Sequence, residues 1–241
     1  MEIWAHRGCS QMYPENTLLA FEKAMQIKDL AGIELDIQMA KDGNLIVIHD
    51  ERVDRTTESI GFVRDYTLKE LRKIHIYAGE NKTQQIPTME EVIDLTEPKL
   101  KAGMKLNIEL KNSIYPYLGM EEKIIELICK RGLEKAVVYS SFYAKSLDKL
   151  KKISPQAELA ILDTKASDCS YKLKGGCGAM AIHPFWKGMD VSLEEVKECR
   201  VRAWMSGHLY PEKPTGTRLN LSKLEKQGIT DIILNEPEKY L

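Results

Sequence analysis

The chain has 241 residues, of which 43% are hydrophobic and 29% charged, and its formal net charge is −1. Length alone allows one large core or two small ones, and the near-zero charge provides no field that would gather nucleic acid or an anionic membrane surface. The start of the chain runs straight into an apolar segment, so we expect no signal peptide, and no apolar run reaches the roughly 18 residues of a membrane-spanning helix.

The five cysteines are odd in number and contain no C-x-x-C pair. This pattern argues against a disulfide framework and against a structural zinc site. We therefore expect a cytoplasmic protein.

The first fifty residues predict a strand, a helix and a hairpin. Residues 2–7 form an apolar strand followed by Gly8, and the next apolar residues recur at helical spacing, with Asn16 or Thr17 as the expected cap. Residues 32–39 form the next strand, and residues 45–48 resume so soon after a Lys-Asp-Gly-Asn turn that the two must pair antiparallel. This pairing is expected to bring Asp36 close to His49 and Asp50.

The middle of the chain predicts an excursion outside the core. Residues 51–87 are polar and loop-rich, with a short helix near 67–74 and the least ordered part at 79–85. A helix should then begin at Pro87-Thr88 and end before Pro98. The strand at 106–111 follows it.

The second half alternates between strands and helices. The expected strands are 136–141, 158–163, 179–183, 201–206 and 230–234, and the expected helices are 120–131, 143–153, 192–199 and 221–227. Only a weak pattern lies between residues 163 and 179. Nine strand-like segments, less the return arm of the hairpin, leave eight for a TIM-type (βα)8 barrel, whose usual size is about 250 residues. We expect one α/β domain over residues 1–241, with a small insertion at about 51–87.

Charged and titratable residues fall where several of these strands end, which is the functional edge of such a barrel. They are His6, Arg7, Glu34, Asp36, His49, Glu109 and Lys111. One buried ion pair could be purely structural, but three converging carboxylates repel one another and would repel an anionic substrate. A hard divalent cation, Mg²⁺ or Ca²⁺, relieves both problems by taking oxygen ligands from Glu34, Asp36 and Glu109.

Histidine is a poorer ligand for such ions and is freer to transfer protons. One histidine could deprotonate an attacking oxygen while the other protonates the leaving oxygen. Arg7 and Lys111 could stabilise phosphate charge, and Asp50 could orient His49.

The order of these motifs resembles the glycerophosphodiester phosphodiesterase family. The matching segments are His6-Arg7-Gly8, Pro14-Glu15-Asn16-Thr17, Glu34-Leu35-Asp36, Lys41-Asp42-Gly43, His49-Asp50, Arg55-Thr56-Thr57, Ile86-Pro87-Thr88, Ile108-Glu109-Leu110-Lys111, Ser141-Phe142 and Gly228-Ile229-Thr230-Asp231-Ile232-Ile233. The resemblance implies a TIM-type barrel that hydrolyses glycerophosphodiesters to an alcohol and sn-glycerol 3-phosphate with one divalent cation.

The same resemblance assigns roles to individual residues. It implies His6 and His49 as the acid/base pair. It implies Glu34, Asp36 and Glu109 as metal ligands, and Arg7 and Lys111 as phosphate contacts.

The substrate rim departs from the family pattern. The family usually has a late-strand tryptophan followed by Thr-Val-Asn, whereas Trp204 is followed by Met-Ser-Gly and by a longer segment at 208–219. Phe142, His183 and Trp204 are the candidate rim residues, although a lone histidine such as His183 is more often structural. The expected partner is a small-molecule substrate, with no nucleic acid and no membrane insertion, and homo-oligomerisation stays open.

Other functions remain open at this point. A related barrel could act on lysophospholipids or phosphoinositol-type head groups, or a catalytically silent barrel could bind a phosphorylated metabolite. If the substrate is a glycerophosphodiester, the 2-hydroxyl of its glycerol lies next to the phosphorylated carbon. We therefore expect attack on phosphorus through a cyclic phosphate intermediate.

Overall fold

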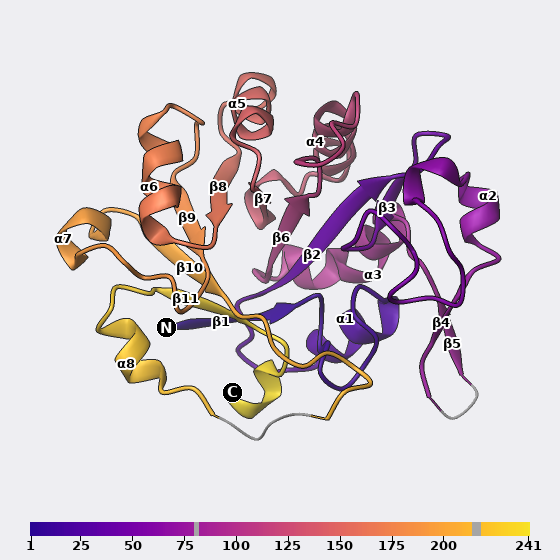
Figure 1. The fold of residues 1–241 in the computed structure, drawn as a ribbon, viewed down its shortest axis with the longest axis horizontal. Helices are drawn as coiled ribbons and strands as arrows, with labels where there is room; N and C mark the ends of the chain where they lie inside the picture. Colours follow the sequence, from indigo (N-terminus) through magenta and orange to yellow (C-terminus); the bar gives the residue numbers. More distant parts are fainter. Residues whose placement is uncertain (80–81, 214–217) are drawn as a thin grey trace.

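Parallel strands pair edge to edge into a closed ring with helices outside it (Figure 1). The computed structural model describes residues 1–79, 82–213 and 218–241. Within them the barrel strands are β1 (Glu2–His6), β2 (Gly32–Met39), β6 (Lys105–Leu110), β7 (Val137–Ser141), β8 (Glu158–Asp163), β9 (Ala181–Pro184), β10 (Arg200–Trp204) and β11 (Asp231–Leu234). Strand β1 pairs with both β11 and β2, which closes the barrel. The predicted TIM-type fold is confirmed.

The helices of the described residues follow the barrel strands or lie in the insertion. They are α1 (Leu18–Ala24), α2 (Leu68–Leu71), α3 (Met89–Lys101), α4 (Met120–Arg131), α5 (Ala144–Ile153), α6 (Ala166–Lys174), α7 (Leu193–Val196) and α8 (Leu221–Glu225), with 3-10 turns η1 (Val63–Asp65), η2 (Glu134–Ala136) and η3 (Pro237–Lys239). Local chemistry sets several ends. The Thr17 hydroxyl caps α1, a capping box between Thr88 and Glu91 starts α3, and Gly132, at φ 64°, ends α4.

Alternation along each strand divides apolar from functional side chains. On β2, Ile33, Leu35 and Ile37 belong to the main core beneath the helices. Glu34 and Asp36 take the opposite side, inside the barrel, and are also buried. The barrel interior is closed in part by Trp4, whose ring lies so close to Gly32 that a Cβ there would meet it at 2.4 Å.

The expected hairpin is present and places the third strand as predicted. Strand β3 (Leu45–Val47) runs antiparallel to β2, with Ile37 opposite Val47. The amide of Ile48 donates to the carbonyl of Asp36 at 3.1 Å. This bond holds the following residue, His49, beside the end of β2.

The insertion carries its own small apolar cluster, and Figure 1 shows it projecting beside the barrel. The cluster includes Val53, Val63, Leu71 and Ile76, together with Ile46 from β3. Because β3 contributes Ile46 to this cluster and Leu45 and Val47 to the main core, we propose that barrel and insertion form one domain.

Two local expectations were wrong, and one region without a predicted element holds a helix. The segment at 79–85 is not all loop, because β5 (Thr83–Gln85) pairs antiparallel with β4 (His75–Tyr77); residues 80–81 of that segment lie outside the described residues. Helix α3 continues through Pro98 to Lys101, since proline lacks only a donor and its carbonyl still accepts from the Ala102 amide at 3.2 Å. The weakly patterned region holds helix α6.

All five cysteines are free thiols. In the part of the chain that the structure describes, no helix has both the length and the apolar character needed to cross a bilayer.

Candidate active site

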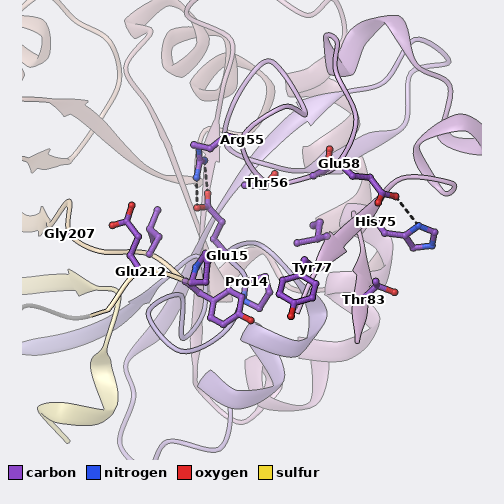
Figure 2. A pocket seen from close by; sticks show the side chains of 15 residues that line it. Pro14, Glu15, Arg55, Thr56, Glu58, His75, Tyr77, Thr83, Gly207 and Glu212 are labelled. Carbon is purple, nitrogen blue, oxygen red and sulfur yellow. Dashed lines mark hydrogen bonds and ion pairs between the residues drawn. The ribbon is translucent and has the colours of Figure 1, made fainter. Parts of the chain in front are cut away.

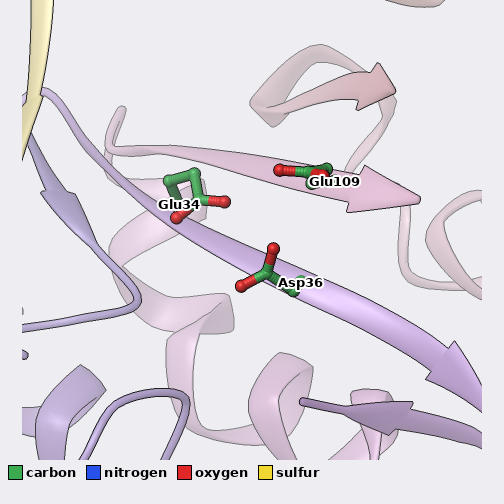
Figure 3. Close-up of side chains that lie close together, drawn as sticks. All are labelled: Glu34, Asp36 and Glu109. Carbon is green, nitrogen blue, oxygen red and sulfur yellow. The ribbon is translucent and has the colours of Figure 1, made fainter. Parts of the chain in front are cut away.

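Three carboxylates converge inside the barrel from two neighbouring strands (Figure 3). Glu34 and Asp36 come from β2, and Glu109 comes from β6. In the parallel pairing of these two strands, Glu109 is the register partner of Asp36. One oxygen from each residue lies within 4.8 Å of the others, and all three residues are buried. Period-two alternation puts the first two on one face, and the parallel register brings the third alongside.

The chemistry of this cluster fits a hard divalent cation. Asp36 Oδ2 accepts from Asn16 Nδ2 at 2.9 Å, whereas its Oδ1 is buried and accepts no hydrogen bond from the described residues. A buried carboxylate oxygen without a donor is costly unless something positive satisfies it. Three carboxylates with such an oxygen among them form an all-oxygen donor set that suits Mg²⁺ or Ca²⁺.

The pKa values of the two β2 acids move in opposite directions. Burial, followed by the charges of Asp36 and Glu109, raises the pKa of Glu34 well above its usual value. Burial acts in the same sense on Asp36, but the charges of His49, Arg7 and Lys111 hold its pKa below the ordinary value. Glu34 is therefore the member of the cluster that most needs a counter-charge.

His6 ends β1 and points into the same space. Its Nε2 lies 3.8 Å from Glu34 Oε2, and its Nδ1 lies 2.6 Å from Asn235 Oδ1. Burial, followed by the charge of Arg7, lowers the pKa of His6 to about 3. The imidazole is thus held neutral beside the acids.

His49 follows β3 and lines the same cavity as His6, Glu34 and Glu109. Its Nδ1 lies 2.5 Å from Asp50 Oδ1, and Lys111 Nζ donates to its Nε2 at 3.1 Å. Lys111 also donates to Glu109 Oε1 at 2.8 Å, so it joins the second histidine to the acids. Gln38 Nε2 donates to the His49 carbonyl at 3.0 Å and fixes the backbone there.

Arg7 occupies a tight left-handed turn after β1. Its φ is 57° and that of Gly8 is 81°, a conformation that a non-glycine residue adopts only where its surroundings impose it. The Arg7 amide donates to the Glu34 carbonyl at 2.9 Å, and its Nε lies 3.2 Å from Asp36 Oδ2. The turn therefore aims the guanidinium at the carboxylates.

A second arginine is tied to the first through one carboxylate. Glu15 accepts from Arg7 Nη1 at 2.8 Å and from Arg55 at 2.6 and 2.8 Å. Arg55 Nε also donates to Asp50 Oδ2 at 2.7 Å. A chain of ion pairs thus runs from Arg7 around to the partner of His49.

A small cavity of about 70 Å³ lies over the acids. Its lining combines the polar groups with a partly apolar wall: His6, Arg7, Glu34, His49, Asn107, Glu109, Phe142, Leu162, Trp204 and Ile233. Two of the three expected rim residues, Phe142 and Trp204, lie on this wall with their rings 6.4 Å apart. Asp36 and Lys111 do not line this cavity but contact residues that do. Asp36 pairs with Arg7, and Lys111 bonds to His49 and Glu109.

The third expected rim residue, His183, does not reach this cavity. It is fully buried, and its Nε2 bonds to Arg202 Nη1 at 2.9 Å inside the barrel. Although His183 lies near the end of β9, its side chain sits below the rim against β10. It packs as a structural core histidine.

A larger cavity of about 570 Å³ is shown in Figure 2. Its walls are the insertion, through residues such as Arg55, Glu58, His75 and Tyr77, and the segment at 207–212, with Pro14 and Glu15 between them. The Arg7–Glu15 pair joins the two cavities, because Arg7 lines the small one and Glu15 the large one. Of the 208–219 segment, residues 214–217 lie outside the described residues.

Sequence reasoning gave no site role to four of these residues. Asn16 was expected at most to cap a helix, but Thr17 does so, and Asn16, at φ 55°, binds Asp36. Glu15 and Arg55 belong to motifs without an assigned site role, and Asn235 belongs to none of the predicted motifs or strands. The sequence signal for Glu15 and Asn16 is two polar residues directly before the expected helix, and no local pattern indicates Arg55 or Asn235.

Comparisons with known proteins agree on one family. A model described as the Glycerophosphoryl diester phosphodiesterase family matches residues 6–174. A glycerophosphodiester phosphodiesterase from Caldanaerobacter subterraneus subsp. tengcongensis is 38% identical over 242 residues, covering 99% of this chain and 96% of that protein. One from Bacillus subtilis is 40% identical over 260 residues, covering 98% and 84%.

Solved structures show the same barrel. A putative glycerophosphoryl diester phosphodiesterase from Agrobacterium tumefaciens superposes with a TM-score of 0.81 at 19% identity, covering 99% of this chain and 95% of that one. An Oleispira antarctica phosphodiesterase, solved with the product sn-glycerol-3-phosphate, gives a TM-score of 0.76 at 24% identity, covering 99% and 94%.

Proposed function

This chain belongs to the glycerophosphodiester phosphodiesterase family and is a phosphoric diester hydrolase, and we propose that it cleaves glycerophosphodiesters to an alcohol and sn-glycerol 3-phosphate with one divalent cation. The observation that carries this proposal is the meeting of three buried carboxylates with two histidines, both of which line one cavity with Glu34 and Glu109. Glu34, Asp36 and Glu109 would hold Mg²⁺ or Ca²⁺. When bound, the cation supplies positive charge against the acids and the substrate phosphate.

The two histidines have different surroundings, and we assign them different roles. His6 is neutral, with Nε2 near the acids, and acts as the base. His49 is backed by Asp50, which stabilises an imidazolium, and acts as the acid. Arg7 and Lys111 lie on either side of the acid cluster and stabilise the negative charge on phosphorus oxygens.

The proposed reaction has two steps. In the first, His6 Nε2 takes the proton of the glycerol 2-hydroxyl as that oxygen attacks phosphorus, and His49 gives its proton to the departing alcohol oxygen. In the second, His49 takes a proton from water as the water oxygen attacks the cyclic phosphate, and His6 returns its proton to the 2-oxygen. Both histidines end as they began. A 2-deoxy substrate hydrolysed at the normal rate would exclude this route.

The larger cavity is proposed to receive the departing alcohol. It adjoins the small cavity through Arg7 and Glu15, and its volume of about 570 Å³ suits a small head group. The substrate is accordingly proposed to be a small water-soluble molecule. The free cysteines fit the cytoplasmic location that we propose.

A substrate panel with and without chelator tests the function. Glycerophosphocholine, glycerophosphoinositol and lysophosphatidylcholine would be compared, with release of the head group, choline or inositol, as the readout. We expect turnover of the two water-soluble diesters, lost on chelation and restored by Mg²⁺ or Ca²⁺. Preference for lysophosphatidylcholine would favour a lysophospholipid-directed enzyme, and binding without turnover would indicate a silent barrel.

A further inference from the structure

Asn235 lies directly after β11 and is 2% exposed. Its two side-chain atoms have different partners. The Oδ1 atom lies 2.6 Å from His6 Nδ1, and the Nδ2 atom donates to the carbonyl of His208 at 3.0 Å. The residue thus joins the first strand of the barrel to the segment after the seventh barrel strand, β10.

The orientation of this amide is set by the His208 carbonyl. A carbonyl oxygen only accepts, so the amide nitrogen must face it. The opposite orientation would place two acceptor oxygens 3.0 Å apart in a buried setting, where such a clash is costly. The amide oxygen must therefore face His6.

The orientation of the amide in turn sets the proton on His6. An oxygen acceptor at 2.6 Å from Nδ1 requires that Nδ1 carry the hydrogen. In a neutral imidazole the other nitrogen then has a free lone pair. That nitrogen, Nε2, is the one near Glu34.

We propose that Asn235 is a positioning residue that holds His6 as the Nδ1–H tautomer, with the unprotonated Nε2 directed at the acid cluster. The tautomer follows from the hydrogen bonds alone, and only its consequence for turnover rests on the proposed function. Without Asn235 the ring can rotate or carry its proton on Nε2, and in either case it no longer offers a base to the substrate.

The same residue connects His6 to the wall of the larger cavity. The Gln11 amide donates to the Asn235 carbonyl at 3.0 Å, and Gln11 Nε2 donates to the Glu212 carbonyl at 2.9 Å. The Tyr210 amide donates to the Ser10 carbonyl at 2.8 Å. These bonds hold the segment at 207–212 in place, and the His208 carbonyl in that segment orients the Asn235 amide. The same contacts therefore position both His6 and the wall of the larger cavity.

Long-range ¹H–¹⁵N correlation NMR on histidine-labelled protein tests the proposal directly, because protonated and unprotonated ring nitrogens have distinct shifts. The His6 signals are identified by their absence from the His6→Gln variant. We expect Nδ1 to be protonated in the unaltered protein. In Asn235→Leu we expect the proton on Nε2 or shared, and kcat about 10- to 100-fold lower with little change in KM.

Two further variants make the result decisive. Asn235→Asp keeps an acceptor opposite Nδ1, so it should keep the tautomer. Its second oxygen replaces the amide donor that faces the His208 carbonyl, so the variant should recover only part of the kcat lost in Asn235→Leu. Asn112→Leu removes another buried amide, one that donates to Glu121 and Ser146, and should leave the His6 tautomer unchanged.

Protonation of Nε2 in the unaltered protein would overturn the proposal, even if Asn235→Leu failed to fold. So would an unchanged tautomer and unchanged kcat in a folded Asn235→Leu. Failure of the proposed function looks different, because full activity of His6→Gln would remove the base role without altering the NMR result.

Discussion

Lys111 Nζ donates a hydrogen bond to His49 Nε2 at 3.1 Å. An ammonium group can only donate, so Nε2 is unprotonated and the hydrogen of the ring lies on Nδ1, facing Asp50 at 2.5 Å. His49 in this state cannot protonate a leaving group. In the proposed reaction, Lys111 would have to turn from Nε2 to the substrate phosphate before His49 could act as the acid, so the lysine and the histidine would act together in that step.

Replacing His49 should remove the acid without removing the base. We expect His49→Ala to lower kcat on glycerophosphocholine by about 10²- to 10⁴-fold, the usual contribution of a general acid. A substrate with p-nitrophenol as leaving group needs no proton in the first step. It should therefore restore most of the rate of the first turnover, measured as a burst of p-nitrophenol release, in His49→Ala but not in His6→Ala. Equal rates for both variants on that substrate would contradict the assignment.

The two acids of β2 should affect metal-free stability with opposite signs. The raised pKa of Glu34 means that its ionised form destabilises the folded chain, by an amount that grows as pH rises above the ordinary value, so Glu34→Gln should increase the free energy of unfolding at neutral pH. The pKa of Asp36 is lowered, so its charge stabilises the fold and Asp36→Asn should decrease that free energy.

Urea unfolding at neutral pH in the presence of chelator measures both effects. In excess Mg²⁺ or Ca²⁺ the unaltered protein should gain stability by ligand binding, and each variant should gain less. If the free energy of unfolding changed in the same direction for both variants in chelator, the opposite electrostatic roles of Glu34 and Asp36 would be contradicted.

Glu15 should matter for both arginines that it binds. Glu15→Gln leaves the buried guanidinium of Arg7 short of a counter-charge, and we expect a loss of about 3 kcal/mol in the free energy of unfolding together with a higher KM. Glu22→Gln, an exposed change on α1, is the matched control and should have little effect on either quantity. Chemical denaturation and steady-state kinetics would decide the point.

Asp231 should give the protein an acid-sensitive contribution to stability. Burial alone would raise its pKa, but hydrogen bonds from Arg200 and the charge of Arg202 lower it to about 2, from an ordinary value of 3.8. This contribution is complete above the unfolded value and is lost as pH falls toward the folded one. Asp231→Asn should therefore cost about 2 kcal/mol at neutral pH.

The difference between Asp231→Asn and the unaltered protein should shrink as pH falls through the interval from about 4 to about 2. Unfolding curves at a series of pH values measure it. A difference independent of pH across that interval would assign the effect to packing around Trp4, whose indole nitrogen donates to Asp231 at 3.0 Å.

The order of the barrel and its acid cluster could be predicted from the sequence because both depend on local periodicity. Alternation along residues 32–39 puts Glu34 and Asp36 on one face, and the short turn after them forces a hairpin. The pair β4 and β5 escaped prediction because short polar segments such as Thr83–Gln85 pair through their backbones and carry no apolar alternation. The sequence predicts that α3 ends before Pro98, but the helix continues to Lys101. Burial of its apolar face outweighs the loss of one backbone donor at the proline.

The sequence by itself determined which chemical groups stand at the strand ends, because strand periodicity and residue type are local properties. Only the tertiary structure decided which of them touch. His6 is the last residue of β1, and His183 lies one residue before the end of β9. His183 lies buried against Arg202 whereas His6 faces the acids, because depth in a barrel depends on the position along the strand and on the stagger of neighbouring strands. Asn235 lies 229 residues from His6, and no local pattern encodes the closure of the ring that makes it the partner of that histidine.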